Sequence, residues 1–423
     1  MSGRFDPERY GPIRRFFRKY GLAFVMVASY FGSGSIFIAS DAGLRYGYSL
    51  IWAAIAATVI GLFAQDMSAR VGIFGGPLMS FVRRKLGQPL ALLIALWLSF
   101  GCILWTLELT AAVGAGLSQL LGGAIGWQPL AVFAGLMAIL AGIRGYDALE
   151  HLMTGMMVAL LLIYVVVGIA AQPDPAGIVA GLFPGAELGQ PGAILAVAAL
   201  LGTTALWPNF FLESILVEEK GWTSREDIPT VRKDLILGYS VGGIITVAIL
   251  VVAAAVLPQM GITEFDSFLT PGFALASVLG EWAMLLFVIG AIAAAFNSIV
   301  PIMWAPAYMI PEALGRDPDS DSREFKVIFV LLTALGSLSP LVHQVTGLSV
   351  VDMIILFPTF NGIFGLPLTV VLLLWAVNDK EMMGEERNHV GLNIAGAILI
   401  LLSFTLATLS LEGFVTAIVG TAP

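Results

Sequence analysis

Long apolar stretches follow one another along almost the whole chain, and they constrain its fold more than any other feature. Each is long enough to cross the roughly 30 Å hydrocarbon core of a bilayer as a helix. With 58% hydrophobic and 12% charged residues and a mean hydropathy of +0.92, the chain lies outside the soluble globular classes. We predict eleven spans, over about 21–47, 49–73, 91–120, 128–144, 151–171, 193–217, 235–257, 272–300, 326–345, 349–376 and 391–419.

The basic residues predict how these spans are oriented. With the N-terminus in the cytoplasm, eleven spans place twenty of the twenty-one Lys and Arg residues on the cytoplasmic side, Arg45 being the exception. Such an excess follows the positive-inside rule. We therefore expect an integral protein of the cell (inner) membrane with a cytoplasmic N-terminus and an external C-terminus. Residues 1–20 would form a cytoplasmic arm, and residues 21–423 a single transmembrane domain.

Two polar interruptions lie inside the apolar segments. The first is Gly32-Ser33-Gly34-Ser35, and the second covers residues 203–209 and contains Pro208. Unwound backbone in mid-membrane survives only where it is buried in protein or lines a cavity. The interruptions fall in spans one and six, which is typical of inverted repeats that each open with a discontinuous helix. We assign the repeats to about 21–171 and 193–376, with 391–419 as an extra helix. The alternatives are close packing of small residues and a simple proline kink.

Several short motifs resemble the NRAMP family of divalent-metal transporters, which share the LeuT-type fold. Their order and spacing cover most of the chain. The motifs are residues 41–48 (DAGLRYGY), 65–72 (QDMSARVG), 181–184 (GLFP) and 209–214 (NFFLES). The resemblance implies an all-α membrane protein with a LeuT-type 5+5 inverted repeat and discontinuous helices 1 and 6.

The family's transition-metal ligands are not retained at the matching positions. At those positions this chain carries Gly32, Ser35, Thr203, Leu206, Pro208 and Thr359. The family also has a pair of acids in helix three; Glu108 keeps the first, and Ala111 stands in place of the second. Neither interruption contains an acidic residue, a histidine or a methionine. Because a dication in mid-membrane without countercharge is strongly disfavoured, the altered motifs argue against transition-metal transport.

Helices that restart after a break expose N–H groups and the positive ends of their dipoles, which favour anions. We therefore expect a secondary active transporter that imports bicarbonate or a similar small inorganic anion by alternating access. The name of the ion rests on the resemblance to an NRAMP-related branch of bicarbonate transporters. The expected substrate-binding residues are Gly32, Ser33, Gly34, Ser35, Thr203, Thr204, Trp207, Asn209 and Thr359. Trp207 either floors the pocket or is an ordinary packing residue.

Anion uptake against an inside-negative potential is uphill, so we expect a co-transported cation, either Na⁺ or H⁺. The candidate coupling residues are Glu108, Asn297 and Ser298. For Asn297 the alternative is a hydrogen bond between helices. Glu213 either contributes to transport or pairs with a base such as Arg70.

Two other functions stay open. One is an atypical divalent-cation transporter that takes largely hydrated Mg²⁺ or Mn²⁺ through hydroxyl and carbonyl groups. The other is a transport-inactive membrane sensor. The sequence contains no Ser-His-Asp constellation, phosphate loop or metal-binding cluster, so we expect no enzyme, no cofactor and no nucleic-acid partner. A monomer surrounded by lipid is the expected state.

Overall fold

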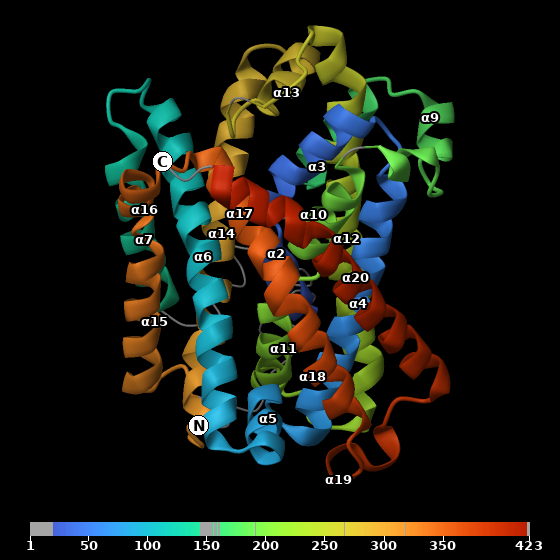
Figure 1. Ribbon diagram of the computed structural model, residues 1–423, viewed down its shortest axis with the longest axis vertical. Coiled ribbons are helices and arrows are strands. Elements are labelled where there is room, and N and C mark those ends of the chain that lie inside the picture. Colours follow the sequence, from blue (N-terminus) through green and yellow to red (C-terminus); the bar gives the residue numbers. More distant parts are fainter. Residues whose placement is uncertain are drawn as a thin grey trace, which may run out of the picture.

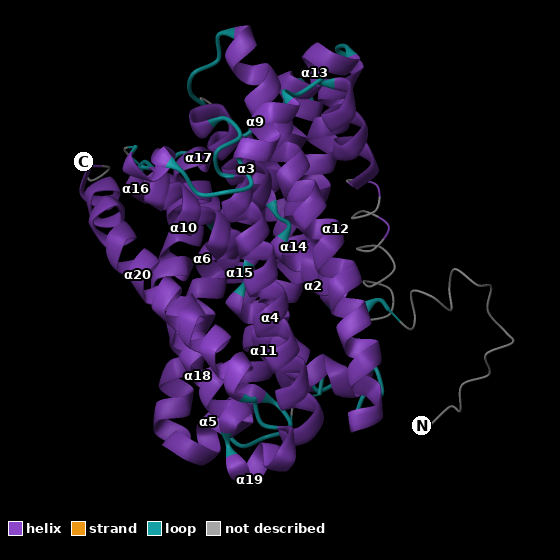
Figure 2. Cartoon of the chain, turned by 90° about the vertical axis from the view of Figure 1, so that its right-hand side faces the viewer, coloured by secondary structure: helices purple, strands orange, loops and turns teal. Residues whose placement is uncertain are grey.

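The computed structural model describes residues 20–143, 155, 159, 161–190, 192–265, 267–317 and 319–420, and within these ranges the chain contains helices and no β-strand (Figure 1). The predicted cytoplasmic arm lies outside the described residues apart from Tyr20. Figure 2 shows the bundle from the side, with most loops gathered at its two ends.

The helices of the first half begin with a short pair and continue with long apolar segments. They are α2 (Leu22–Tyr30), α3 (Ser33–Tyr46), α4 (Ile51–Gly75), α5 (Leu78–Leu86), α6 (Gln88–Leu120), α7 (Trp127–Gly142) and the helix Leu161–Ala170.

The second half of the chain also contains a pair of short helices, α10 and α11, separated by a break. Its helices are α9 (Pro175–Ala180), α10 (Ala193–Thr204), α11 (Trp207–Glu219), α12 (Ile228–Val256), α13 (Gly272–Leu279), α14 (Trp282–Ala313), α15 (Arg323–Gly336), α16 (Ser339–Thr346), α17 (Val350–Phe360), the π-helical turn η5 (Asn361–Gly365), α18 (Leu366–Asn378), α19 (Lys380–Met383) and α20 (Val390–Gly420).

The number of spans is partly tested by these helices. Eight helices in the described part of the chain are long and apolar enough to cross a membrane, or nine when α2 and α3 count as one broken span. Two shorter apolar helices, α7 and Leu161–Ala170, lie within the predicted fourth and fifth spans. Part of the fifth span lies outside the described residues. The count of eleven therefore stays a prediction.

The first interruption is a sharp bend between two half-helices. The α2 and α3 axes differ by 62°. Gly32 connects them in an extended conformation, and a Cβ atom there would lie 2.9 Å from both Leu109 Cδ2 and Ser298 Oγ. Only glycine therefore lets the bend lie this close to α6 and α14.

The second interruption separates α10 from α11 at Ala205 and Leu206. Pro208 lies in the first turn of α11, where its missing N–H leaves no helical hydrogen bond unmade. Pro208 thus lies at the start of a second half-helix, and the proline-kink alternative does not describe this span.

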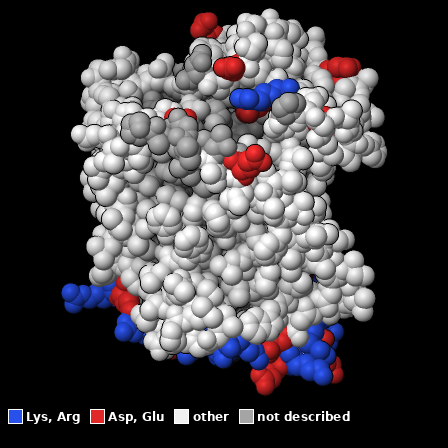
Figure 3. Space-filling view, viewed as in Figure 1, with Lys and Arg blue, Asp and Glu red and all other residues white. Residues whose placement is uncertain are grey.

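Basic side chains gather at one end of the bundle. On the face in Figure 3 the Lys and Arg residues lie mostly at the lower end, where Figure 1 places α5 and α19. We call this the basic end; it includes Arg83, Arg84 and Lys85 of α5 and Lys380 of α19. The segregation agrees with the predicted charge pattern, and α11 runs from the second break towards this end.

Candidate functional site

The two broken spans meet at one small central cavity. Its volume is about 10 Å³, room for about one water molecule. It is lined by Ser29, Tyr30, Gly32, Gly34 and Ser35 of the first broken span, Thr203 and Leu206 of the second, Trp105, Glu108 and Leu109 of α6, Ser298 and Ile302 of α14, and Pro358 of α17. The paired arrangement predicted from the sequence is therefore present.

A carboxyl group enters this cavity from α6. The Glu108 side chain is buried, and its Oε2 accepts a hydrogen bond of 2.7 Å from the Ser33 hydroxyl. At Gly34 a Cβ atom would lie 3.7 Å from Glu108 Oε1, so the glycine leaves the carboxyl room beside the break. No ion pair of the described residues involves Glu108. When ionised, this carboxyl group would therefore be a buried negative charge with no ion-pair partner among the described residues.

Hydroxyl and backbone oxygens surround the carboxyl group. Ser35 donates a hydrogen bond of 2.6 Å to the Tyr30 carbonyl, and Ser298 donates one of 3.1 Å to the Ala28 carbonyl. A hydroxyl that donates to a carbonyl keeps lone pairs with which to contact a cation. Apart from the Trp105 indole, the polar side chains of the lining residues consequently carry oxygen atoms alone.

Each break lies between the C-terminus of one helix and the N-terminus of the next. At the first break, α2 ends at Tyr30 with carbonyl groups, and α3 begins at Ser33 with N–H groups. The second break likewise joins the C-terminus of α10 to the N-terminus of α11. Since the two ends carry opposite partial charges, the helix dipoles do not decide the sign of the bound ion. Glu108 carries the one acidic side chain among the lining residues.

Asn209 lies behind the cavity. Its Oδ1 accepts a hydrogen bond of 2.8 Å from the Ser29 hydroxyl, and its Nδ2 donates one of 2.7 Å to the Met26 carbonyl. Asn209 is fully buried and does not line the cavity. Asn209 therefore connects α11 to α2 through these two hydrogen bonds.

Two other predicted binding residues also lie beside the cavity without lining it. Thr204 is buried next to Thr203. Trp207 is buried with its ring centroid 5.9 Å from that of Trp105, which does line the cavity. The Trp207 Nε1 donates a hydrogen bond of 3.2 Å to Asn361 Oδ1. Trp207 thus packs against the lining residue Trp105 without itself lining the cavity.

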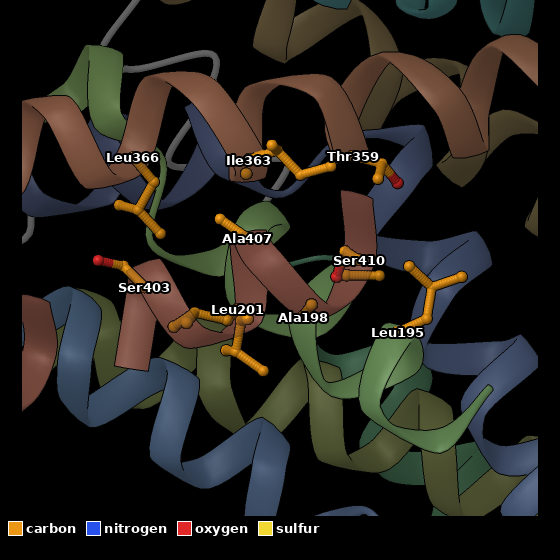
Figure 4. Close-up of a pocket in the computed structure, with 12 residues that line it drawn as sticks. Leu195, Ala198, Leu201, Thr359, Ile363, Leu366, Ser403, Ala407 and Ser410 are labelled. Atoms are coloured by element: carbon orange, nitrogen blue, oxygen red, sulfur yellow. The ribbon is translucent and has the colours of Figure 1, made fainter. Parts of the chain in front are cut away.

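Thr359 lies in a different pocket. Figure 4 shows this pocket, where Thr359 and Ile363 face Ser410 and Ala407 of α20. Its volume is about 20 Å³, and its other walls come from α10. The Thr359 hydroxyl donates to the Ile355 carbonyl at 2.7 Å. The structure therefore does not bring Thr359 to the central cavity.

The candidate coupling residues separate in the same way. Glu108 and Ser298 line the cavity, whereas Asn297 does not. Asn297 is buried, and neither its Oδ1 nor its Nδ2 has a hydrogen-bond partner among the described residues. The alternative of a hydrogen bond between helices is thus not what the structure shows.

Glu213 does not pair with Arg70. The Gln65 amide donates to Glu213 Oε2 at 3.0 Å, while Arg70 binds Asp66 at 3.0 Å and Asn388 at 2.7 Å. Sequence reasoning also missed Ser29, Tyr30 and Trp105 as cavity residues. Trp105 could have been found from Glu108, because positions three apart share one helix face.

The chain is similar in sequence to a family of transporters over most of its length. The family model described as "Natural resistance-associated macrophage protein-like" (Nramp) matches residues 23–411. The "Divalent metal cation transporter MntH" of Aeromonas hydrophila is 25% identical over 407 residues, which cover 92% of this chain and 95% of that protein. The protein of the same description from Mycobacterium leprae is 26% identical over 400 residues, with 90% and 89% covered.

Solved structures share the fold. A manganese transporter of Eremococcus coleocola superposes with a TM-score of 0.77 at 18% identity, covering 99% of this chain and 91% of that one. Mhp1, a nucleobase-cation-symport-1 family transporter in a closed conformation, gives a TM-score of 0.57 at 15% identity, covering 96% and 93%. The predicted all-α, LeuT-type fold is therefore confirmed.

The predicted anion substrate is wrong. Relatives that match over about nine-tenths of the chain are described as divalent metal cation transporters. The predictions of a bicarbonate-like partner and of sodium symport are corrected with it. The physical reason is that the prediction considered acids within the two breaks alone, whereas the fold adds Glu108 from α6. It also counted the positive helix ends and not the negative ones that adjoin them.

Proposed function

This chain belongs to the Nramp family, and from that premise we propose that it is a secondary active transporter that moves divalent metal cations across the membrane by alternating access. The observation that carries the proposal is the Glu108 carboxyl group at the first break. It supplies the countercharge that a dication needs in mid-membrane. The names of the relatives, which describe divalent metal cation transporters, support the same cargo class.

The donor set favours a hard cation. The cavity offers a carboxylate, serine and threonine hydroxyls and backbone carbonyls, which suit Mn²⁺ and Mg²⁺. Among the lining residues there is no histidine, methionine or cysteine, the ligands that softer metals prefer. We therefore propose that the transporter selects Mn²⁺ or Mg²⁺ over Zn²⁺ and Cd²⁺.

The size of the cavity ranks these two ions. A volume of about 10 Å³ has room for about one water molecule and not for a full hydration shell. The cation must exchange most of its waters for protein oxygens. Because Mg²⁺ loses water reluctantly, Mn²⁺ is the better cargo.

The proposal includes the topology and the coupling ion. We place the basic end in the cytoplasm and treat the chain as one transmembrane domain of two repeats, with α20 outside them. Of the two coupling ions expected from the sequence, we keep H⁺ as a proposal. A carboxyl group that loses its proton when a dication binds, as Glu108 can, would link the movement of the two ions.

Uptake by the reconstituted full-length protein tests the proposal. We expect saturable uptake of Mn²⁺ into proteoliposomes and weaker uptake of Mg²⁺. In Glu108→Gln, which removes the countercharge, the rate of Mn²⁺ uptake should fall about tenfold or more. The control is Glu281→Gln, an exposed acid at the start of α14 outside the cavity. A folded protein that neither binds nor transports a divalent cation would overturn the function. Full activity in Glu108→Gln would overturn the site.

A further inference from the structure

The first residue of α11 lies directly beyond the cavity on the side of the basic end. Trp207 begins α11, which runs from the second break towards that end. Its indole ring is 1% exposed and packs 5.9 Å from the ring of Trp105, a cavity-lining residue. Any path from the cavity along α11 therefore passes Trp207.

One side chain holds the Trp207 ring in place. Asn361 Oδ1 accepts the hydrogen bond from Trp207 Nε1 at 3.2 Å, and Asn361 Nδ2 donates to the Gly101 and Phe357 carbonyls at 3.0 Å each. Asn361 thereby connects α11, α6 and α17. It is also the first residue of η5, and such π-helical turns are rare and frequently lie at functional sites.

Two glycines are shaped to this contact. A Cβ atom at Gly101 would lie 2.2 Å from Asn361 Oδ1, and one at Gly365 would lie 2.2 Å from Trp207 Nε1. Neither position can carry a side chain while the indole and the amide keep their places. The hydrogen bond between Trp207 and Asn361 is therefore buried and depends on glycine at both positions.

We propose that Asn361 is a positioning residue that holds Trp207 as the barrier between the central cavity and the basic end. We call Trp207, Asn361, Gly101 and Gly365 the latch. Because α6 also carries Glu108 and Trp105, the latch ties the half-helix α11 to the wall of the cavity. Opening the basic end by moving α11 breaks the Trp207–Asn361 bond. The latch thus biases the protein towards the closed state, whichever cation is carried, and this inference goes beyond the proposed function.

The size of the bias follows from the strength of one buried hydrogen bond. Losing such a bond shifts a two-state equilibrium about 2- to 10-fold. Asn361→Ala and Trp207→Phe each remove the bond, and the phenylalanine keeps a ring in the same place. Both variants are expected to increase opening towards the basic end by this factor.

Accessibility of a single cysteine measures the opening without any cargo. The only cysteine of the chain, Cys102, is buried and is replaced by serine. Thr203→Cys then places a thiol in the cavity lining. A membrane-impermeant thiol reagent is applied to intact cells and to inverted vesicles, which expose opposite ends. A separate Glu381→Cys reporter, on an exposed side chain of α19, identifies the preparation that exposes the basic end.

The expected result is a 2- to 10-fold faster labelling of the cavity thiol in both latch variants (about the range set by one hydrogen bond), from the basic end alone. The double variant should label no faster than the faster single variant, because both remove one interaction. The matched control is Asn378→Ala, whose amide bonds the Leu374 carbonyl and Asn393 Oδ1 at 2.8 Å each, away from the break. It should leave the rate unchanged.

Three results would overturn the latch. They are unchanged labelling in Trp207→Phe, an equal rise from both ends, and additive effects in the double variant. If Asn361→Ala does not fold, Trp207→Phe alone decides the matter, since it keeps an aromatic ring at this position. Because the assay measures thiol labelling and not metal uptake, failure of the latch is distinguishable from failure of the proposed transport activity.

Discussion

The Ser33 hydroxyl lies 2.7 Å from Glu108 Oε2 and donates a hydrogen bond to it. This contact joins the first turn of α3, directly after the bend, to the middle of α6. It orients the carboxyl group towards a cavity in which the other polar side-chain groups are hydroxyls and the Trp105 indole. A neighbouring helix thus supplies the acidic side chain of a cavity that both breaks border.

Removing that hydroxyl should weaken cation binding without unfolding the protein. In Ser33→Ala the Glu108 carboxyl group loses its orienting hydrogen bond, and such a bond to a charged group corresponds to about tenfold in affinity. We expect the KM for Mn²⁺ uptake to rise by about this factor while kcat changes less. Ser118→Ala, at the other end of α6, is the control. A KM equal to that of the parent protein would contradict this role of Ser33.

Two of the three threonines expected at the site should behave differently. Thr203 lines the central cavity, whereas Thr359 lines the pocket beside α20. Replacing each by valine keeps the shape and removes the hydroxyl. We expect Thr203→Val to lower the apparent affinity for Mn²⁺ by about threefold or more and Thr359→Val to leave it unchanged. Uptake kinetics of the two variants decide this, and the reverse ranking would show that the cavity is assigned to the wrong residues.

The bend itself should not tolerate a methyl group. In Gly32→Ala the new Cβ atom would lie 2.9 Å from Leu109 and Ser298, so α3 must move away from α6 and α14. Overpacking of this kind destabilises by about 1–3 kcal/mol. We expect a lower midpoint of thermal unfolding and reduced uptake. Gly189→Ala, where nothing lies within 4 Å of the added atom, should change neither quantity.

A contact at the basic end should depend on pH and salt. Lys85 Nζ lies 2.7 Å from Asp379 Oδ2, and this hydrogen bond holds the pKa of Asp379 below its usual value of 3.8. A depressed pKa means that the contact stabilises the folded state above pH 3.8 and that the stabilisation is lost as the pH falls through the lower folded-state value. High salt should weaken it at every pH, because both groups are near the surface.

Amide hydrogen exchange of α19 measures this contact. In Lys85→Met, α19 should exchange faster than in the parent protein at pH 7. The difference should shrink in strong acid, where Asp379 is protonated in both proteins. A difference that grew as the pH fell would contradict the assigned ion pair.

Some parts of the site follow from local sequence. The Gly32-Ser33-Gly34-Ser35 run lowers helix propensity within an apolar segment, and Pro208 can begin a helix but not continue one. Both breaks therefore form where the sequence predicts them. The position of Thr359 does not follow in this way, because it depends on how far the helix is rotated about its axis. Asn361, two residues later, points towards Trp207 and not to the pocket of Thr359.

By itself the sequence determined the membrane environment, the helical class and the two broken spans, because apolar run length and helix-breaking residues act over a few neighbouring positions. The tertiary structure alone decided which other side chains lie at the breaks. Ser33 and Glu108 are 75 residues apart in the chain, and only the packing of α3 against α6 places the carboxyl group beside the break. A charge that arrives from another helix cannot be read from the break itself, and in a medium of low polarity that one charge outweighs the helix dipoles.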